Sequence, residues 1–226
     1  MYIQITTKCN MKCAHCGFAC TRTGEHMPLN VFQKALSIAV SRNEAVTIGG
    51  GEPTMHPRFF EFLELVREEA RRGKFEITPF MVTNGKATGK ARRLLRILER
   101  EREILEPEER TIDARLSQDE WHEPIDRDVV ARYARLGDKN RATAFHTVQR
   151  IAPVGRGASR RFDWMREEWE VKCLCNTPLV DPQGRVWACG CKKHMLGSVW
   201  DRGILNDYEE EFAHYGGREP NKEEAA

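Results

Sequence analysis

The sequence predicts an α/β fold in which a parallel sheet closes, fully or partly, into a βα barrel. Short apolar, β-branched runs alternate with helical patterns along most of the 226 residues. Alternation repeated this often favours parallel strands joined by right-handed crossovers. The most distinctive residues follow the ends of the expected strands, where such folds bind ligands. Fold class and site location are therefore predicted together.

Five strands and four helices are expected. The strands cover residues 2–7, 44–49, 75–82, 110–117 and 142–151. The helices cover residues 28–42, 57–72, 87–105 and 127–136. Pro28 suits a first helical turn, and apolar residues recur at helical spacing. The expected inward faces are Val31, Phe32, Ala35, Leu36 and Ala39, then Phe59, Phe60, Leu63, Val66 and Ala70, then Ala91, Leu94, Leu95 and Leu98. The Arg/Glu run of the third helix is interpreted as a solvated face.

Composition limits the class of protein. With 36 basic and 34 acidic side chains, the net charge of +2 predicts no strong attraction to nucleic acid or to a membrane surface. No run approaches the roughly 18 apolar residues of a membrane span, and the start "MYIQITTKCN" has no basic and apolar leader. A soluble protein in the reducing cytoplasm is expected, with a polar, disordered tail at 216–226.

Four of the eight cysteines lie in "KCNMKCAHCGFAC", directly after the first expected strand. Cys9, Cys13 and Cys16 have the spacing CxxxCxxC, and thiolates so spaced in a loop can hold an iron-sulfur cluster. Three close ligands suit a four-iron cluster with one open iron. Tetrahedral zinc needs a fourth ligand, from His15, Cys20 or a distant residue. The spacing favours the cluster, and Cys20 is interpreted as a small buried hydrophobe.

This loop, with aromatic His15 before the third cysteine and Gly50-Gly51-Glu52 ending the second strand, resembles the radical S-adenosylmethionine (radical SAM) family over residues 1 to about 165. The resemblance implies a partial (β/α)6, TIM-like barrel and an oxygen-sensitive enzyme. Cys9, Cys13 and Cys16 would bind a 4Fe-4S cluster whose fourth iron is chelated by S-adenosylmethionine. Reductive cleavage would then give methionine and a 5'-deoxyadenosyl radical, which abstracts hydrogen from the substrate.

The same resemblance assigns the other strand ends. Gly50, Gly51 and Glu52 match the motif that binds the methionine amino group. Thr83 and Asn84 match a segment near the nucleoside, although a plain turn explains "TNG" equally well. Ser117 matches a residue whose hydroxyl meets the ribose.

Five further polar or aromatic residues leave alternatives open. Asp119 and His122 could handle a proton after the radical step, whereas Trp121 is interpreted as packing. Arg156, in "APVGRG", could grip a carboxylate of substrate or cofactor, or could face solvent. His56, beside Pro57, is interpreted as structural.

The rear cysteines form a second group. In "CLCNTPLVDPQGRVWACGC", Asp-Pro-Gln-Gly predicts a turn between two short strands, which would gather Cys173, Cys175, Cys189 and Cys191. The segment resembles the start of a SPASM or twitch extension, which implies an auxiliary 4Fe-4S cluster; structural zinc is the alternative. The expected division is a barrel at 1–165, a twitch-like region at 166–215 and the tail.

The substrate is predicted only by class. A peptide or protein side chain is the first expectation, for an oxidation, cross-link or rearrangement. Because the sequence starts at the first strand, a separate docking protein would present that peptide. A nucleotide or nucleic-acid base is the alternative, and a non-catalytic zinc or iron-sulfur protein is the alternative of another class. The expected reductant is a flavodoxin or ferredoxin.

Overall fold

The computed structural model describes residues 1–137, 145–146, 155–156 and 177–206. The described strands are β1 (Tyr2–Thr6), β2 (Thr47–Gly50), β3 (Phe80–Thr83), β4 (Asp113–Ser117), β5 (Phe145–His146), β6 (Leu179–Val180), β7 (Arg185–Trp187) and β8 (Met195–Ser198). The α-helices are α1 (Leu29–Ser41), α2 (Phe59–Arg71), α3 (Thr88–Ile104) and α4 (Arg127–Leu136), and two 3-10 turns lie at Pro53–Met55 and Pro107–Glu109. All four expected helices are therefore confirmed.

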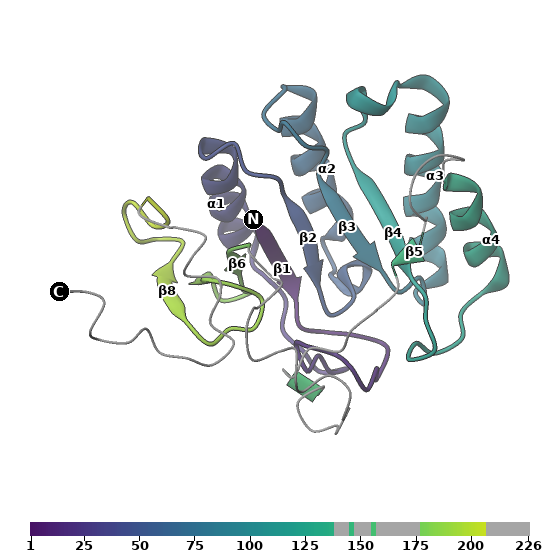
Figure 1. Cartoon of the computed structure of the whole chain (residues 1–226), viewed down its shortest axis with the longest axis horizontal. Coiled ribbons are helices and arrows are strands. Elements are labelled where there is room, and N and C mark those ends of the chain that lie inside the picture. Colours follow the sequence, from purple (N-terminus) through teal and green to yellow (C-terminus); the bar gives the residue numbers. More distant parts are fainter. Residues whose placement is uncertain (138–144, 147–154, 157–176, 207–226) are drawn as a thin grey trace, which may run out of the picture.

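The described strands form one sheet, in the order β5-β4-β3-β2-β1-β6-β7-β8. From β1 to β5 each strand runs parallel to the one before it and lies beside it. Right-handed crossovers that always advance in one direction place every connecting helix on the same face. Figure 1 shows α1 to α4 following one another along one side of the sheet. A parallel-rich α/β fold is confirmed, whereas closure into a partial barrel stays a prediction.

Strand alternation separates a core face from a functional face. Ile3, Ile48 and Met81 point toward the helices and have no exposed surface. Their neighbours Tyr2 and Phe80 are only partly buried and line a cavity on the opposite face. The helices therefore cover one side of the sheet and leave the other side to the site.

Helix α2 buries Phe59 as expected, but its second buried phenylalanine is Phe62 and not Phe60. Phe62 has no exposed surface and stacks on Phe32 of α1, with ring centroids 4.1 Å apart. Phe60 is only partly buried, under the guanidinium of Arg93 at 3.8 Å from the ring centroid. The stripe follows the i, i+3, i+4 spacing from Phe59, which selects Phe62 and excludes Phe60.

Three strands are shorter than expected. β2 and β4 begin three residues late, and β3 begins only at Phe80, because Pro79 has no amide hydrogen for the ladder and Ile77 is 65% exposed. β5 is the described part of the strand expected at 142–151; the other residues of that range lie outside the described ones.

The predicted turn between two short strands is confirmed. β6 and β7 pair in antiparallel fashion around Asp181–Gly184, where Gly184 has φ +81°. The buried Asp181 carboxylate accepts bonds from the amides of Gln183 and Arg185 and from the indole of Trp187. β6 also pairs in parallel with β1, so this hairpin continues the main sheet. The expected boundary near residue 165 lies outside the described residues.

Candidate functional site

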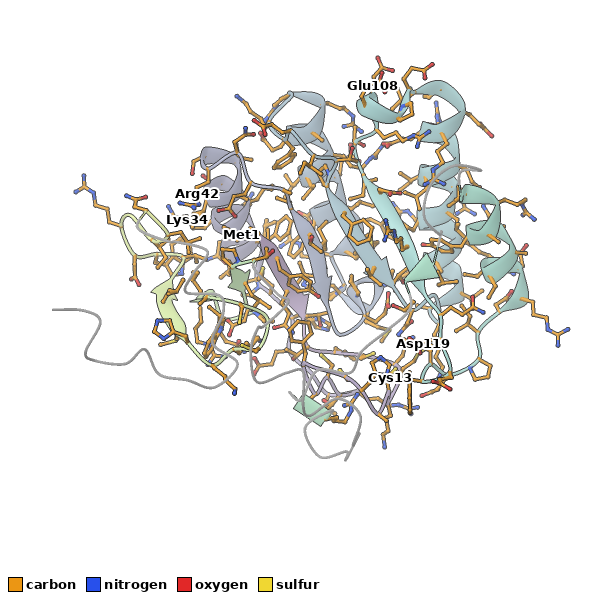
Figure 2. All side chains as sticks on the ribbon, viewed as in Figure 1. Met1, Cys13, Lys34, Arg42, Glu108 and Asp119 are labelled. Carbon is orange, nitrogen blue, oxygen red and sulfur yellow. The ribbon has the colours of Figure 1, made fainter. Side chains whose placement is uncertain are left out.

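A cavity of about 410 Å³ opens at the carboxyl ends of the first parallel strands. Its lining includes ten of the residues singled out from the sequence: Cys9, Cys13, Cys16, Gly50, Gly51, Glu52, Asn84, Ser117, His122 and Arg156. Figure 2 shows Cys13 and Asp119 together at this end of the molecule, far from Glu108 at the other end. These residues lie together at the carboxyl ends of the strands, where such folds bind ligands.

The three front cysteines lie in the loop that follows β1. Cys9 is buried beside Met11 and Cys20, while Cys13 and Cys16 pack partly exposed against them. The sulfur of Cys9 accepts hydrogen bonds from the Met11 amide at 3.4 Å and from the Asn84 side chain at 3.7 Å. Donors aimed at a sulfur stabilise its thiolate form, which is the form that binds metal.

Burial governs the acidity of these thiols. It raises the pKa of Cys9, and, together with the nearby Cys9 and Cys16, it raises the pKa of Cys13 to about 11. A hydrogen bond from Cys20 lowers the pKa of Cys16 and raises that of Cys20 itself. Cys20 is 2% exposed, as expected of a small buried hydrophobe. Its contact with Cys16 was missed, because no spacing rule links the two.

The glycine turn after β2 serves close packing of backbone. A Cβ on Gly49 would lie 1.8 Å from the Tyr2 hydroxyl, and one on Gly51 would lie 2.3 Å from the Lys8 carbonyl oxygen. Gly50 has φ +140°, a conformation that side chains disfavour. The amide of Glu52 donates to Lys8 at 2.9 Å. The glycines thus bring the end of β2 against the cysteine loop.

Glu52 is a buried organiser of the strand ends. It is 1% exposed and accepts bonds from the Asn84 amide at 2.6 Å, the Thr83 hydroxyl at 2.7 Å and the amide and hydroxyl of Thr54 at 3.1 and 2.6 Å. Burial raises the pKa of Glu52, and these donors oppose that effect. One of its oxygens accepts three of the four bonds, so any bond to a ligand ammonium falls to the other oxygen.

Asn84 joins the end of β3 to the cysteine loop. Its side chain donates to the Asn10 side-chain oxygen at 2.9 Å as well as to Cys9, and it accepts from the Lys86 amide at 3.0 Å. Gly85 follows with φ +68°. The segment is a turn, as one interpretation expected, and its place near a nucleoside stays a prediction.

The end of β4 contributes a carboxylate–imidazole pair. Asp119 and His122 Nδ1 lie 2.6 Å apart, and the His122 ring lies 5.0 Å from that of His15, centroid to centroid. Asp119 also accepts from the Trp121 amide at 2.9 Å. Ser117 and His122 line the cavity, and the bond between Asp119 and Nδ1 orients the His122 ring.

Arg156 contacts the cysteine loop. Its side chain donates to the carbonyl oxygens of Cys13, at 3.0 Å, and Cys20, at 2.5 Å. The sequence suggested a grip on a carboxylate or a solvent-facing side chain and gave no sign of these carbonyl partners. Binding of a carboxylate by Arg156 stays a prediction.

His56 has the structural role expected of it. It is 1% exposed, lies 3.0 Å from the Met27 carbonyl oxygen and accepts from the Arg58 amide at 3.1 Å. Burial lowers the pKa of His56 to about 4. The neutral ring thus connects the segments that precede α1 and α2.

The rear cysteines are described only in part. Cys189 and Cys191 lie after β7, with their sulfur atoms 2.6 Å apart. The loop between them approaches the front loop, because a Cβ on Gly190 would lie 3.8 Å from the Phe18 ring. Cys173 and Cys175 lie outside the described residues. A four-cysteine site therefore stays a prediction.

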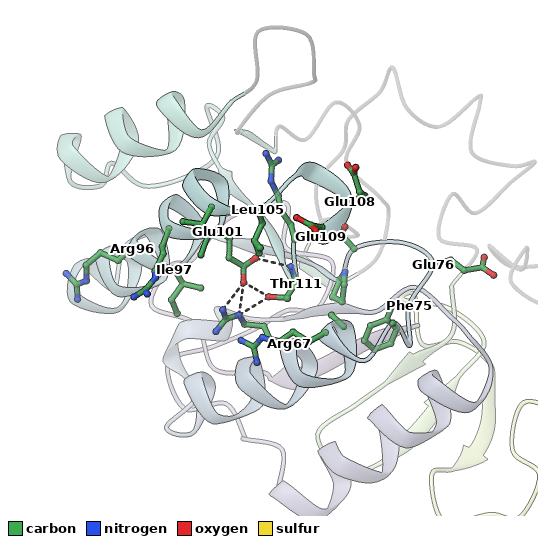
Figure 3. Close-up of a pocket in the computed structure, with 18 of the residues that line it drawn as sticks. Arg67, Phe75, Glu76, Arg96, Ile97, Glu101, Leu105, Glu108, Glu109 and Thr111 are labelled. Carbon is green, nitrogen blue, oxygen red and sulfur yellow. Dashed lines mark hydrogen bonds and ion pairs between the residues drawn. The ribbon is translucent and has the colours of Figure 1, made fainter.

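A larger cavity, of about 1030 Å³, lies at the opposite end, between α2 and α3 (Figure 3). The buried carboxylate of Glu101 accepts there from Arg67 at 2.7 Å and from the Thr111 amide at 2.9 Å. None of the residues predicted to act in catalysis lines this cavity.

Among the described residues, no helix has both the length and the apolar character needed to cross a membrane.

Known proteins resemble the chain in fold and in part of its sequence. A structure of BtrN in complex with AdoMet and 2-DOIA has a TM-score of 0.56 at 14% identity, over 92% of this chain and 80% of that one. BtrN in an open conformation has a TM-score of 0.52 at 15% identity, over 94% of this chain and 84% of that one. Such low identity shows the fold alone.

A Pyrococcus furiosus protein, the tungsten-containing aldehyde ferredoxin oxidoreductase cofactor-modifying protein, is 38% identical over 77 residues, which are 32% of this chain and 21% of that protein. The chain thus matches about a fifth of the length of this relative. Residues 3–105, which hold the three front cysteines and the Gly50-Gly51-Glu52 turn, match the family model of the radical SAM superfamily.

Proposed function

We propose that the protein is a radical SAM enzyme, which cleaves S-adenosylmethionine reductively and abstracts hydrogen from a substrate. The observation that carries this proposal is the cavity lined at once by Cys9, Cys13, Cys16 and the ends of β2, β3 and β4. The family match over residues 3–105 supports the same reaction class.

The residues present fit a 4Fe-4S cluster. Three thiols from one short loop meet at the cavity, and two donors reach the Cys9 sulfur. Cys9, Cys13 and Cys16 would hold three irons and leave the fourth to S-adenosylmethionine. When bound and reduced by the external reductant, the cluster would supply one electron to the sulfonium, whose bond to the 5' carbon would break to give methionine and a 5'-deoxyadenosyl radical.

The chain's own groups would position the remaining atoms. Gly50, Gly51 and Glu52 line the cavity, and the Glu52 oxygen that accepts only from the Asn84 amide would accept from a ligand ammonium. Ser117 offers a hydroxyl to a ribose from the end of β4. His122, oriented by Asp119 at 2.6 Å, can accept or return a proton at its Nε2 atom.

The test is anaerobic reconstitution followed by counts of iron and sulfide and by chromatographic detection of 5'-deoxyadenosine. Cys9→Ala, Cys13→Ala and Cys16→Ala should each lose the cluster and the cleavage activity. Cys20→Ala is the matched control, because it removes a thiol from the same loop that is not assigned to iron. Undiminished 5'-deoxyadenosine formation in the first three variants would overturn the proposal, as would stoichiometric zinc without cluster absorption.

The rear cysteines are proposed to hold a second, auxiliary 4Fe-4S cluster, with Cys173, Cys175, Cys189 and Cys191 as ligands. The pairing of Cys189 with Cys191 and the hairpin before them support this assignment. Wild-type protein should then contain about eight irons per chain, and Cys189→Ala about four. Zinc at the rear site would instead leave the iron count of the two proteins equal.

For the substrate we propose a peptide or protein side chain, with a nucleotide or nucleic-acid base as the alternative, and for the reductant a cytoplasmic flavodoxin or ferredoxin. A structure with S-adenosylmethionine bound distinguishes a peptide groove from a nucleotide pocket beside the 5' carbon.

A further inference from the structure

Arg156 reaches the cysteine loop from a segment that lies far along the chain. Its backbone amide donates to the Cys16 carbonyl oxygen at 3.0 Å, and its side chain donates to those of Cys13 and Cys20. One residue thus holds three carbonyl groups of the loop, two of which belong to the cysteines assigned to iron.

The local backbone explains how Arg156 comes so close. Gly155 has φ +57°, and a Cβ there would lie 2.3 Å from the Gly17 carbonyl oxygen and 2.5 Å from that of Cys16. No larger residue fits without moving one of the two segments. The Gly155-Arg156 pair is therefore built to meet this loop.

The loop itself has little regular structure to hold it. The Cys9 amide donates to the Thr21 carbonyl oxygen at 2.7 Å and closes the base of the loop. Between these ends the loop has two overlapping turns, in which the Cys16 amide donates to the Cys13 carbonyl oxygen at 3.3 Å and the Ala19 amide donates to that of Cys16 at 3.2 Å. A carbonyl oxygen can accept two hydrogen bonds, so the carbonyl groups in these turns can still accept from a further donor. The guanidinium offers rigid, forked donors, which fix two carbonyl groups relative to each other.

We infer that Arg156 is a positioning residue that fixes the shape of the cysteine loop and places a permanent positive charge beside the cluster held there. The part of the inference that concerns the charge beside the cluster rests on the proposed function, whereas the part that concerns the loop shape does not. A nearby cation favours the reduced, more negative cluster, so the charge raises its reduction potential. The electron still comes from the external reductant.

Four variants separate the bonds from the charge. Arg156→Gln removes both, and Arg156→Lys keeps the charge without the forked donors. Gly155→Ala keeps the arginine but forces it away from the loop. Arg22→Gln is the control, because it removes an equal charge from an exposed position just beyond the same loop. Far-UV circular dichroism and thermal midpoints verify that each variant folds.

The readouts are the rate of iron loss to a chelator and the midpoint potential from a redox titration followed by electron paramagnetic resonance. Arg156→Gln should lose iron about tenfold faster or more and have a lower potential. Gly155→Ala should also lose iron faster, whereas Arg156→Lys should lose iron faster at nearly the wild-type potential. Arg22→Gln should match wild type in both.

Wild-type values in Arg156→Gln would overturn the inference, and so would equal effects of Arg156→Gln and Arg22→Gln. Hydrogen exchange of the metal-free proteins tests the loop independently of iron. Peptides covering residues 9–21 should exchange faster in Arg156→Gln than in wild type, and equal exchange would reject the positioning role. A wild-type protein that binds no cluster would contradict the proposed function, while the hydrogen-exchange comparison would still test the positioning role of Arg156.

Discussion

The carboxylate of Glu52 accepts a hydrogen bond of 2.6 Å from the backbone amide of Asn84, and this bond ties the end of β2 to the end of β3. Asn84 in turn reaches Asn10 and the sulfur of Cys9. The three strand ends around the cavity therefore depend on one another. A substitution at Glu52 should therefore also change the conformation of the cysteine loop.

Glu52→Gln should lower the free energy of unfolding by about 2–3 kcal/mol. An NH2 group would replace one carboxylate oxygen, so at least one donor that now bonds to Glu52 would be buried without an acceptor. Urea unfolding of the metal-free, reduced protein measures this. The control is Glu61→Gln, which breaks an exposed pair with Arg58 and should leave the free energy of unfolding close to the wild-type value. Equal losses in the two variants would contradict the role assigned to Glu52.

Gly51→Ala should destabilise the protein by about 2 kcal/mol or more, since its Cβ would lie 2.3 Å from the Lys8 carbonyl oxygen and 3.1 Å from the Cys9 Cβ. It should also reduce the iron content after reconstitution. Gly89→Ala, in α3 with open space around it, should instead stabilise the protein by up to about 1 kcal/mol. A Gly51→Ala protein with wild-type stability and iron would refute the close-approach argument.

His56 should make stability depend on pH below neutrality. Because burial holds its folded-state pKa at about 4, below the ordinary 6.5, the unfolded chain binds the extra proton between these values. Stability should therefore be full above pH 6.5 and fall by about 2–3 kcal/mol as the pH drops toward 4. Urea titrations at several pH values measure the slope.

His56→Gln should remove that part of the pH dependence, whereas His194→Gln, at an exposed histidine, should leave it in place. An unchanged slope in His56→Gln would mean that other groups cause the loss of stability in acid.

Glu101→Gln should cost about 2–3 kcal/mol of stability, because Arg67 and Thr111 both donate to this buried carboxylate (Figure 3). At 25 °C the rate of S-adenosylmethionine cleavage should stay at the wild-type level, since Glu101 lies at the end of the molecule opposite the cysteines. Glu108→Gln, at an exposed position beside the same cavity, should leave both stability and cleavage unchanged. Loss of cleavage in a folded Glu101→Gln protein would reveal coupling between the two ends.

Sequence reasoning predicted the elements with strong periodicity. The stripe Ala91, Leu94, Leu95 and Leu98 is buried in α3 as expected, and the helix expected at 127–136 is α4. Strand limits were less predictable, because a run such as "FEITPF" has strand-like residues but contains Pro79, whose missing donor ends the ladder. The pairing of β6 with β1 was not predicted, since two-residue strands carry almost no local signal.

Sequence reasoning predicted which residues lie close together where a motif coincides with a strand end. Cys9, Cys13, Cys16, Asn84 and Ser117 do line one cavity. The partners of these residues could not be predicted, because the bonds of Arg156 to loop carbonyl groups join backbone atoms that every residue type has. The glycines of "IGGGEP" were assigned to contact with a ligand, but they also serve contact with Tyr2, Thr6 and Lys8. A pattern of residue types does not reveal which backbone a glycine must admit.

The pairing of Tyr2 with Leu179 and Ile3 with Val180 makes β1 an interior strand whose second neighbour, β6, is synthesised only after β2 to β5. On the ribosome, one edge of β1 thus waits roughly ten seconds or more for its partner. An open edge of this kind is a template for association between chains. Nascent or truncated chains that end before β6 should therefore aggregate, and slower synthesis should aggravate the loss.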